Sequence, residues 1–317
     1  MAVTPRIAGD EALDDAVAIL RGGGIVAVPT ETVYGLAARA DSDAAVAAIY
    51  RAKGRPSFNP LIVHVPDLEA VRMLAAIDER AEALAEKLWP GALTLVLPRR
   101  PDAGLAPAVS AGLPTIALRC PAHPLMRALL ERCGFSLAAP SANRSGAISP
   151  TEPAHVAASL GAAVPLILDG GRCEAGIEST IVALRGDGRW EILRPGPIDR
   201  ERLAGVLGAG NEAVASTGAI EAPGQLAGHY APSKPLRLEA ERTAPDEFLI
   251  GFGALAGDTT LSAAGDLAEA AARLYRCLHE ADAAPQPRIG IARVPEDGIG
   301  AAINDRLRRA AARYSGS

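Results

Sequence analysis

Two cations one residue apart, Lys53 and Arg55, stand in a loop rich in glycine and proline, and Asn59 and His64 follow them. The stretch from residue 44 to residue 66 contains no Asp or Glu. A cationic loop without acidic neighbours predicts an anion-binding site, because backbone N–H groups and helix ends add their dipoles to the side-chain charges. The alternative is a solvated basic turn, which would be the better interpretation of an isolated Lys-x-Arg pair.

More cations, hydroxyls and amides lie in loops beside the predicted strands. Besides Lys53 and Arg55, this anion-handling set comprises Thr30, Thr32, Asn59, Arg119, Ser141, Asn143, Ser145, Ser149, Ser179 and Arg194. Arg offers a fixed fork to a carboxylate or phosphate, whereas Lys supplies a mobile point charge. Each residue also has an ordinary explanation: an ion pair for Arg119, a satisfied core histidine for His64, and turn chemistry for the 141–149 loop. Their convergence at strand ends favours a site.

Several common kinds of site are excluded. The chain has no G-x-x-x-x-G-K-[ST] motif, and therefore no Walker-type phosphate cradle. It also lacks H-E-x-x-H, G-x-S-x-G and Cys–His arrangements, so hydrolytic nucleophile chemistry has no visible carrier. The four cysteines have no C-x-x-C spacing, which is typical of reduced core thiols and predicts a cytoplasmic protein. Without an apolar leader or an 18-residue apolar run, neither secretion nor a membrane span is expected.

The length, composition and charge of the chain limit its number of domains and the kinds of partner it can bind. A length of 317 residues predicts about two domains of ~150 residues each. Hydrophobic residues make up 49% of the chain and charged residues 22%, which is enough for a packed core. Aromatic residues reach only 3%, which disfavours base-stacking platforms for single-stranded nucleic acid. The net charge of −5 gives no overall basic footprint, so any RNA contact would be local.

Alternating strands and helices must position the candidate groups. Strands are predicted at 25–28, 61–65, 92–97, 114–119, 136–139 and 166–169, with helices beginning at Asp43 and Asp78 and covering 123–133. Between apolar segments 180–184 and 189–193, Asp187 and Gly188 give a strong hairpin signal. The sequence therefore predicts an α/β fold with a twisted, mixed, open sheet flanked by helices. The first strand delivers residues 29–32 to its carboxyl end, where open α/β sheets place ligands.

The chain divides into three predicted parts. Residues 1–207 form the first domain. Residues 208–235 are rich in Gly, Ala and Pro with little periodicity, which indicates a linker. Residues 236–317 form a smaller α/β domain with strands at 248–252 and 288–294 and helices over 267–278 and 299–310.

Five motifs stand in a fixed order along the chain. They are P-T-E-T-V-Y-G-L at 29–36, K-G-R-P-x-x-N-P-L-I-V-H at 53–64, W-P-G-x-L-T at 89–94, A-P-S-A-N-x-S-G at 139–146 and E-S-T-I-V at 178–182. In this order they resemble the threonylcarbamoyl-AMP synthase family, also called YrdC-like, over about the first two thirds of the chain. The remainder resembles the extra, Rossmann-like domain of the family's long, two-domain form.

The resemblance implies a reaction. L-threonine, bicarbonate and ATP would condense to threonylcarbamoyl-AMP with release of pyrophosphate. The product would pass to the tRNA threonylcarbamoyl transferase machinery for the threonylcarbamoyladenosine modification of tRNA. A carbamate oxygen would attack the α-phosphorus in line, so the enzyme's task is positioning and charge neutralisation. Mg²⁺ is expected to ride mainly on the phosphates, since no carboxylate pair for it is evident.

The resemblance also implies residue roles, with Lys53 and Arg55 as the catalytic pair. Threonine and its carbamate would be held by Thr32, His64, Arg119, Ser179 and the backbone of Ala139. The nucleotide would be held by Lys53, Arg55, Asn59, Thr115, Ser141, Asn143, Ser149 and Arg194, together with Tyr230. In the family's long form the linker lies over the nucleotide site. Residues 208–235 are therefore expected to act as a lid that shields the mixed anhydride from water.

Two alternatives compete with this interpretation. The family's core fold has been thought of as a double-stranded RNA binder, so the chain could be an RNA-binding module without catalysis. A net acidic chain makes few phosphate contacts, which disfavours strong binding and leaves only a weak RNA contact open. A similar domain also occurs in the carbamoyl-transfer protein of hydrogenase maturation. That protein is much longer and carries zinc-finger motifs, which the cysteine spacing here rules out.

Overall fold

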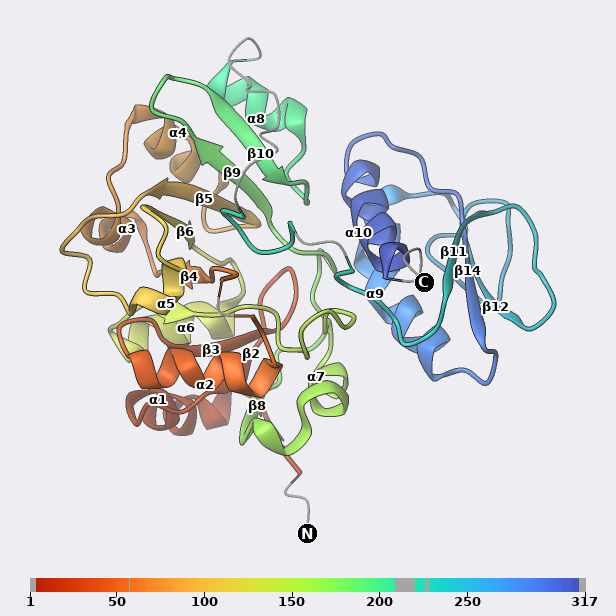
Figure 1. Ribbon diagram of the computed structural model, residues 1–317, viewed down its shortest axis with the longest axis horizontal. Helices are drawn as coiled ribbons and strands as arrows, with labels where there is room; N and C mark the ends of the chain where they lie inside the picture. The colour runs from red at the N-terminus through yellow and green to blue at the C-terminus, as the bar shows by residue number, and fades with distance from the viewer. Residues whose placement is uncertain (1–3, 57, 209–219, 226–227, 314–317) are drawn as a thin grey trace.

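The computed structural model describes residues 4–56, 58–208, 220–225 and 228–313 (Figure 1). Within them the chain forms one ten-stranded sheet and one four-stranded sheet. In Figure 1 the larger sheet and its helices lie on the left, and the C-terminal unit lies on the right. Part of the predicted linker, residues 209–219 and 226–227, lies outside the described residues.

The ten-stranded sheet is mixed, as predicted. Its order is β1-β8-β2-β3-β7-β4-β6-β5-β9-β10. The strands are β1 (Arg6–Ala8), β2 (Val26–Val28), β3 (Gly35–Arg39), β4 (Ile62–His64), β5 (Leu93–Pro98), β6 (Thr115–Arg119), β7 (Leu137–Ala138), β8 (Leu166–Leu168), β9 (Thr180–Leu184) and β10 (Trp190–Arg194). Pairs such as β4–β6 and β5–β9 are parallel, whereas β9 and β10 form the antiparallel hairpin that the sequence predicted.

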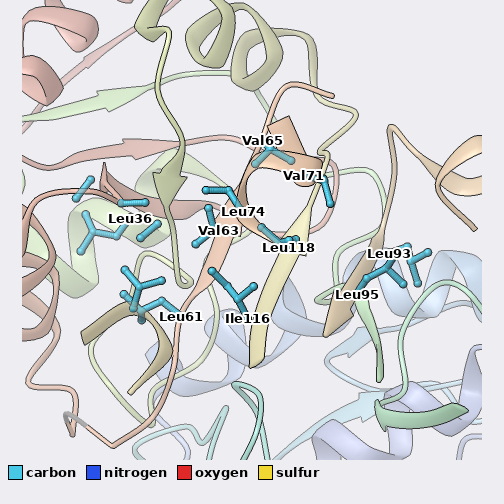
Figure 2. Close-up of a cluster of buried hydrophobic side chains, with 14 of the residues drawn as sticks. Leu36, Leu61, Val63, Val65, Val71, Leu74, Leu93, Leu95, Ile116 and Leu118 are labelled. Atoms are coloured by element: carbon cyan, nitrogen blue, oxygen red, sulfur yellow. The ribbon is translucent and has the colours of Figure 1, made fainter. Parts of the chain in front are cut away.

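Helices cover both faces of this sheet. The main core lies on one face beneath α2 (Asp43–Lys53), α3 (Leu68–Leu74), α4 (Glu79–Leu88), α5 (Pro107–Ser110), α7 (Pro153–Leu160) and α8 (Arg200–Leu207). Figure 2 shows the centre of this core, where Val63 and Leu118 from neighbouring strands lie among Leu36, Leu74 and Leu95. On the opposite face, α1 (Leu13–Arg21) and α6 (Pro124–Cys133) cover a second apolar cluster.

The opposite face is not wholly covered by helices. A separate apolar cluster on that face includes Ile62, Ala117 and Leu193, and it packs against Ala222 from the predicted linker. Side chains alternate along a strand, so Ile62 and His64 point away from the core that holds Val63. This strip between the helices and the linker is where the candidate site lies.

The C-terminal sheet is parallel in the order β11-β14-β12-β13. Its strands are β11 (Leu236–Ala240), β12 (Glu247–Gly251), β13 (Thr259–Thr260) and β14 (Arg288–Ala292), and its helices are α9 (Leu267–Ala283) and α10 (Gly300–Ala312). The apolar cluster of this unit also includes Val33, Ile148 and Ile177 from the first part of the chain. The two parts therefore share a buried contact.

Short elements account for most of the differences from the predicted elements. The prediction omitted β3, which begins at Gly35 near the end of the 29–36 motif, and it also omitted β1, β11, β13, α3, α5, α7 and α8. The strand β3 is held by antiparallel pairing with β2 and β7, which no local signal announces. The helix α7 has Pro153 in its first turn, a start signal that the sequence did offer.

Two general features of the described chain concern its cysteines and the length of its apolar helices. All four cysteines are buried and free, as predicted. None of the described helices combines the length and the apolarity that crossing a bilayer requires.

Candidate active site

A small cavity of about 40 Å³ lies over the strip of the large sheet that no helix covers. Its lining comprises Thr30, Thr32, Val33, Gly35, Arg55, Ile62, His64, Arg119, Ala139, Pro140, Ser141, Glu178, Arg194, Pro223, Gly224, His229 and Tyr230. The walls thus come from strand faces as well as from strand ends. The sequence predicted a site at strand ends only, because it could not tell which face of β4 would be left without a helix.

Strand register brings the threonine candidates together. His64 of β4 pairs with Arg119 of β6, and both strands run in the same direction. The backbone N–H of Ala139 donates to the carbonyl of Ile62 at 3.0 Å, which fixes the segment after β7 beside β4. Burial, and then the charge of Arg119, lower the pKa of His64 to about 3, so its imidazole is neutral at physiological pH.

The loop after β2 carries an acid that the sequence analysis did not single out. Glu31 pairs with Arg119 at 2.7 Å and also accepts from the backbone N–H of Ala122 at 3.0 Å. Burial acts to raise the pKa of Glu31, but the charge and hydrogen bond of Arg119 outweigh it and lower the pKa. Arg119 is therefore both a cavity-lining residue and a member of a buried ion pair.

The two central cations are compensated by backbone carbonyls. The Lys53 ammonium donates to the carbonyls of Ser141 and Asn143, each at 2.6 Å. Arg55 donates through Nε to the carbonyl of Asn59 at 3.2 Å and through Nη2 to that of Pro60 at 2.8 Å. Burial lowers the pKa of both cations, that of Arg55 to about 10. Arg55 lines the cavity, whereas Lys53 holds the 141–143 loop in place beneath it.

A further buried guanidinium, that of Arg194, lines the same cavity. Arg194, at the end of β10, donates through Nε to the carbonyl and through Nη2 to the hydroxyl of Ser179, both at 3.1 Å. The Ser179 hydroxyl also lies 2.7 Å from that of Thr94. A third bond, from Nη1 to the Pro223 carbonyl at 3.3 Å, ties Arg194 to the segment after α8. Hairpin, loop and linker are thereby joined at one guanidinium.

Several buried polar atoms around the cavity make no hydrogen bond within the described residues. They are Asn59 Oδ1, His64 Nδ1, Asn143 Oδ1, His229 Nδ1 and the Tyr230 hydroxyl. Buried polar atoms in folded proteins are nearly always paired, and each unpaired one requires an explanation. Three of these atoms belong to residues that line the cavity, His64, His229 and Tyr230, and a polar ligand there accounts for them.

The structure brings together most of the predicted site residues. Thr32, Arg55, His64, Arg119, Ala139, Ser141, Arg194 and Tyr230 line the cavity. Lys53, Asn59, Asn143, Ser149 and Ser179 each share a hydrogen bond with a lining residue. Thr115 stands apart, because it begins β6 opposite Pro98, at the other end of the strand from Arg119.

Comparisons with known proteins identify the family of the chain. The family model described as "Telomere recombination" matches residues 18–196, and the one described as "Threonylcarbamoyl-AMP synthase, C-terminal domain" matches residues 198–312. The chain is 40% identical to threonylcarbamoyl-AMP synthase of Bacillus subtilis, covering 95% of this chain and 93% of that protein. The chain belongs to the threonylcarbamoyl-AMP synthase family.

Two further comparisons extend over nearly the whole chain. Threonylcarbamoyl-AMP synthase of Pyrococcus abyssi is 37% identical, over 93% of this chain and 92% of that protein. The crystal structure of P. abyssi Sua5 complexed with L-threonine superposes with a TM-score of 0.88 at 34% identity, covering 98% of both chains. Both parts of the chain therefore follow the arrangement of that family.

In this member of the threonylcarbamoyl-AMP synthase family, sequence reasoning missed Glu178 and Arg306. Glu178 lines the cavity, and Arg306 of α10 donates to it at 2.9 Å. Each could have been noticed in the sequence, Glu178 as the first residue of the E-S-T-I-V motif and Arg306 from its place in a helix. Arg306 falls on the apolar stripe of its helix between Ile303 and Ala310, and an arginine there is buried only when paired. However, no local sequence pattern indicates that its partner is Glu178, 128 residues away.

Proposed function

We propose that this chain condenses L-threonine, bicarbonate and ATP to threonylcarbamoyl-AMP and pyrophosphate. The observation that carries the proposal is the cavity itself. It places two buried guanidiniums, Arg55 and Arg194, beside a cluster of unpaired polar atoms, in a chain of the threonylcarbamoyl-AMP synthase family. Buried cations without matching acids suit a reaction between anions.

For threonine we propose the end of the cavity formed by Thr32, His64, Arg119 and Ala139, with Ser179 beside it. Arg119 uses one nitrogen for Glu31, and its fork has further N–H donors for a carboxylate. The neutral imidazole of His64 has its unpaired Nδ1 in this region. The P. abyssi structure with L-threonine supports this assignment, because its fold superposes closely on the chain.

For ATP we propose the end formed by Arg55, Ser141 and Arg194, with Lys53 positioning the Ser141 loop. The threonine amine and bicarbonate first form N-carboxythreonine, with a C–N bond made and water lost. A carbamate oxygen then attacks the α-phosphorus, the new P–O bond forms, and the bond to the β-phosphate oxygen breaks as pyrophosphate leaves. The cations neutralise the charge that gathers on the phosphoryl oxygens and the leaving group. No protein nucleophile or covalent intermediate is needed, because the two substrates react directly.

The remaining nucleotide candidates support this end of the site in different ways. Asn59 and Asn143 each offer an unpaired side-chain oxygen. The hydroxyl of Ser149 is committed to Glu178, so we propose that it positions that carboxylate. Thr115 was expected to hold ATP, but it lines no part of the cavity, so we propose no contact between it and the nucleotide.

We further propose that residues 208–235 act as a lid between the first domain, 1–207, and the C-terminal domain, 236–317. The cavity has room for only a few water molecules, so substrates enter only if a wall moves. Pro223, Gly224, His229 and Tyr230 from this segment form one wall. Tyr230 is buried with a φ of 65°, which is uncommon for a residue other than glycine, and its hydroxyl is unpaired.

Mg²⁺ and the downstream partner complete the proposal. The described residues contain no group of three or more His, Cys, Asp or Glu side chains able to hold a metal. Mg²⁺ would therefore arrive on the ATP phosphates. The product would pass to the machinery that modifies tRNA. The comparisons give no support to the RNA-binding alternative, and the cytoplasmic location stays a prediction from the reduced cysteines.

The experiment is pyrophosphate release from ATP with threonine and bicarbonate, together with mass spectrometry of the adduct. We expect release to require all three substrates and to be abolished by omitting threonine. Retention on double-stranded RNA is measured in parallel at low and moderate salt. Strong salt-resistant RNA binding without pyrophosphate release would replace the synthase with the RNA-binding module.

A further inference from the structure

Glu178 is a carboxylate in the wall of an anion site. It directly precedes Ser179 and β9, is 5% exposed, and lines the same cavity as Arg55 and Arg194. An unneutralised carboxylate at this position would repel a triphosphate. Opposite charges must therefore be supplied to it from another direction.

The C-terminal helices supply them. Arg306 of α10 donates through Nε to Glu178 at 2.9 Å, and the hydroxyl of Tyr275 on α9 lies 2.9 and 3.1 Å from the two carboxylate oxygens. Both side chains are fully buried. From the first part of the chain, Ser149 donates to the same carboxylate at 2.5 Å. Two of these three donors thus come from the C-terminal domain.

Arg306 is itself held by that domain and by the linker. Its Nη1 lies 2.9 Å from Asp305, and its guanidinium carbon lies 5.3 Å from the centre of the Tyr230 ring. A cation over an aromatic face is favourable when both are desolvated. The same guanidinium therefore touches the catalytic domain through Glu178, and the proposed lid through Tyr230.

The charge balance shows what this contact does. Burial acts to raise the pKa of Glu178, but the charges of Arg306 and then Arg194 bring the pKa to about 2, so the carboxylate is ionised. After Arg306, the charge of Arg194 acts most strongly on this carboxylate, and Arg194 lines the same cavity. Without Arg306, Arg194 would be drawn from Ser179 and from the anionic substrate toward Glu178.

We propose that Arg306 is a positioning residue of the active site, through which the C-terminal domain neutralises Glu178 and leaves the charge of Arg194 to the anionic substrate. This inference rests on the proposed function in taking ATP as that substrate. It assigns the C-terminal domain a direct part in building the site, in addition to covering apolar surface of the first domain.

A purely structural ion pair would also bury these two residues, and the test must separate the two roles. A structural pair predicts that Arg306→Met lowers the melting temperature and that ATP binding follows the folded fraction. A positioning role predicts weaker ATP binding by the folded protein. It also predicts that binding returns when the carboxylate is removed, because Glu178→Gln takes away the charge that needs neutralising.

The experiment uses the full chain and measures ATP binding by calorimetry, the KM for ATP and kcat in pyrophosphate release, and the melting temperature. The variants are Arg306→Met, Arg306→Lys and the double variant Glu178→Gln with Arg306→Met. Arg308→Met is the matched control, because Arg308 lies on the same helix and its ion pair with Glu296 is exposed.

We expect Arg306→Met to weaken ATP binding and raise the KM about tenfold or more, with kcat changed less. The double variant, Arg306→Lys and Arg308→Met should stay within about threefold of the unmodified chain, since each keeps the balance around Glu178. The double variant replaces a buried ion pair with neutral groups. It therefore also decides the matter if Arg306→Met alone does not fold.

Three results would overturn the proposal. They are unchanged ATP binding in folded Arg306→Met, a folded double variant that binds ATP ten times more weakly than the unmodified chain, and failure of both variants to fold. If the unmodified chain binds ATP with this pattern but releases no pyrophosphate, the proposed function fails and the role of Arg306 stands. If it releases pyrophosphate without the pattern, only the role of Arg306 fails.

Discussion

Replacing Arg55 tests whether the cationic loop stabilises the transition state. Burial lowers the pKa of Arg55 from 12.5 to about 10. At 1.36 kcal/mol per pKa unit, keeping this guanidinium charged in its buried position costs about 3 kcal/mol. A bound phosphate can offset that cost. The expected size of the effect comes from comparable sites, where loss of one donor to a developing oxyanion costs about 2.7–4 kcal/mol.

We therefore expect Arg55→Ala to lower kcat/KM for ATP by roughly 150-fold, since each 1.36 kcal/mol is a tenfold change in rate. The assay is pyrophosphate release under saturating threonine and bicarbonate. Arg51→Ala is the matched control, because Arg51 is one turn earlier on α2 and exposed. The melting temperature of both variants is measured alongside.

An active Arg55→Ala variant would contradict this role of the guanidinium. If folded Arg55→Ala keeps kcat/KM within about threefold of the unmodified chain, the guanidinium does not meet the reacting phosphates. Arg55 would then serve only to hold the carbonyls of Asn59 and Pro60 in place. An equal loss in Arg51→Ala would instead indicate a general effect of positive charge.

Four other expectations follow from the site. Lys53→Ala should lower both activity and melting temperature, because it leaves the buried Asn143 carbonyl unpaired at about 1–3 kcal/mol and takes one of two donors from the Ser141 carbonyl; an unchanged melting temperature would contradict this. In the pyrophosphate-release assay, serine should lose about 1–3 kcal/mol of transition-state binding relative to threonine, and valine should lose more. If valine reacted as well as threonine, the proposed threonine pocket would be wrong. Tyr230→Ala should weaken ATP binding or speed loss of the adduct, and truncation after Gly208 should leave a folded first domain that binds threonine but turns over poorly. If both proteins match the intact chain, the linker is only a tether. Because the pKa of Glu178 is lowered from 4.5 to about 2, its ionised form contributes stability above pH 4.5 that is lost as the pH falls through about 2. The melting-temperature gap between the unmodified chain and Glu178→Gln should therefore narrow from pH 5 to pH 2.5, and a constant gap would contradict the assignment.

Local signals determined much of the first domain from the sequence alone. The Asp78 side chain accepts from the backbone N–H of Ala81, which caps the helix that was predicted to begin there. The hairpin predicted from Asp187 and Gly188 forms between β9 and β10. The Lys53–Arg55 loop follows a helix whose end is set by Gly54 in a left-handed conformation. Helix caps, turns and apolar periodicity depend on only a few neighbouring residues, so they can be recognised from the sequence alone.

Many residues that line the candidate site could also be predicted from the sequence, because they are concentrated in a few short motifs. An acid-free stretch holding Lys53 and Arg55 predicted two cations without carboxylate partners. In the structure, carbonyls from the 59–60 and 141–143 segments meet these cations instead. The sequence could predict that the charges would need partners. It could not predict that backbone oxygens from a distant loop would provide them.

Only the tertiary structure decided how distant charges are paired and which face of the sheet bears the site. Glu31 meets Arg119 across 88 residues, and Glu178 meets Arg306 across 128. His64 faces the cavity because the helices that pack on β4 cover the side that holds Val63. Pairing over such separations depends on strand order and on the docking of the second domain. Both follow from the burial of apolar surface summed over the whole chain, and no local pattern records that sum.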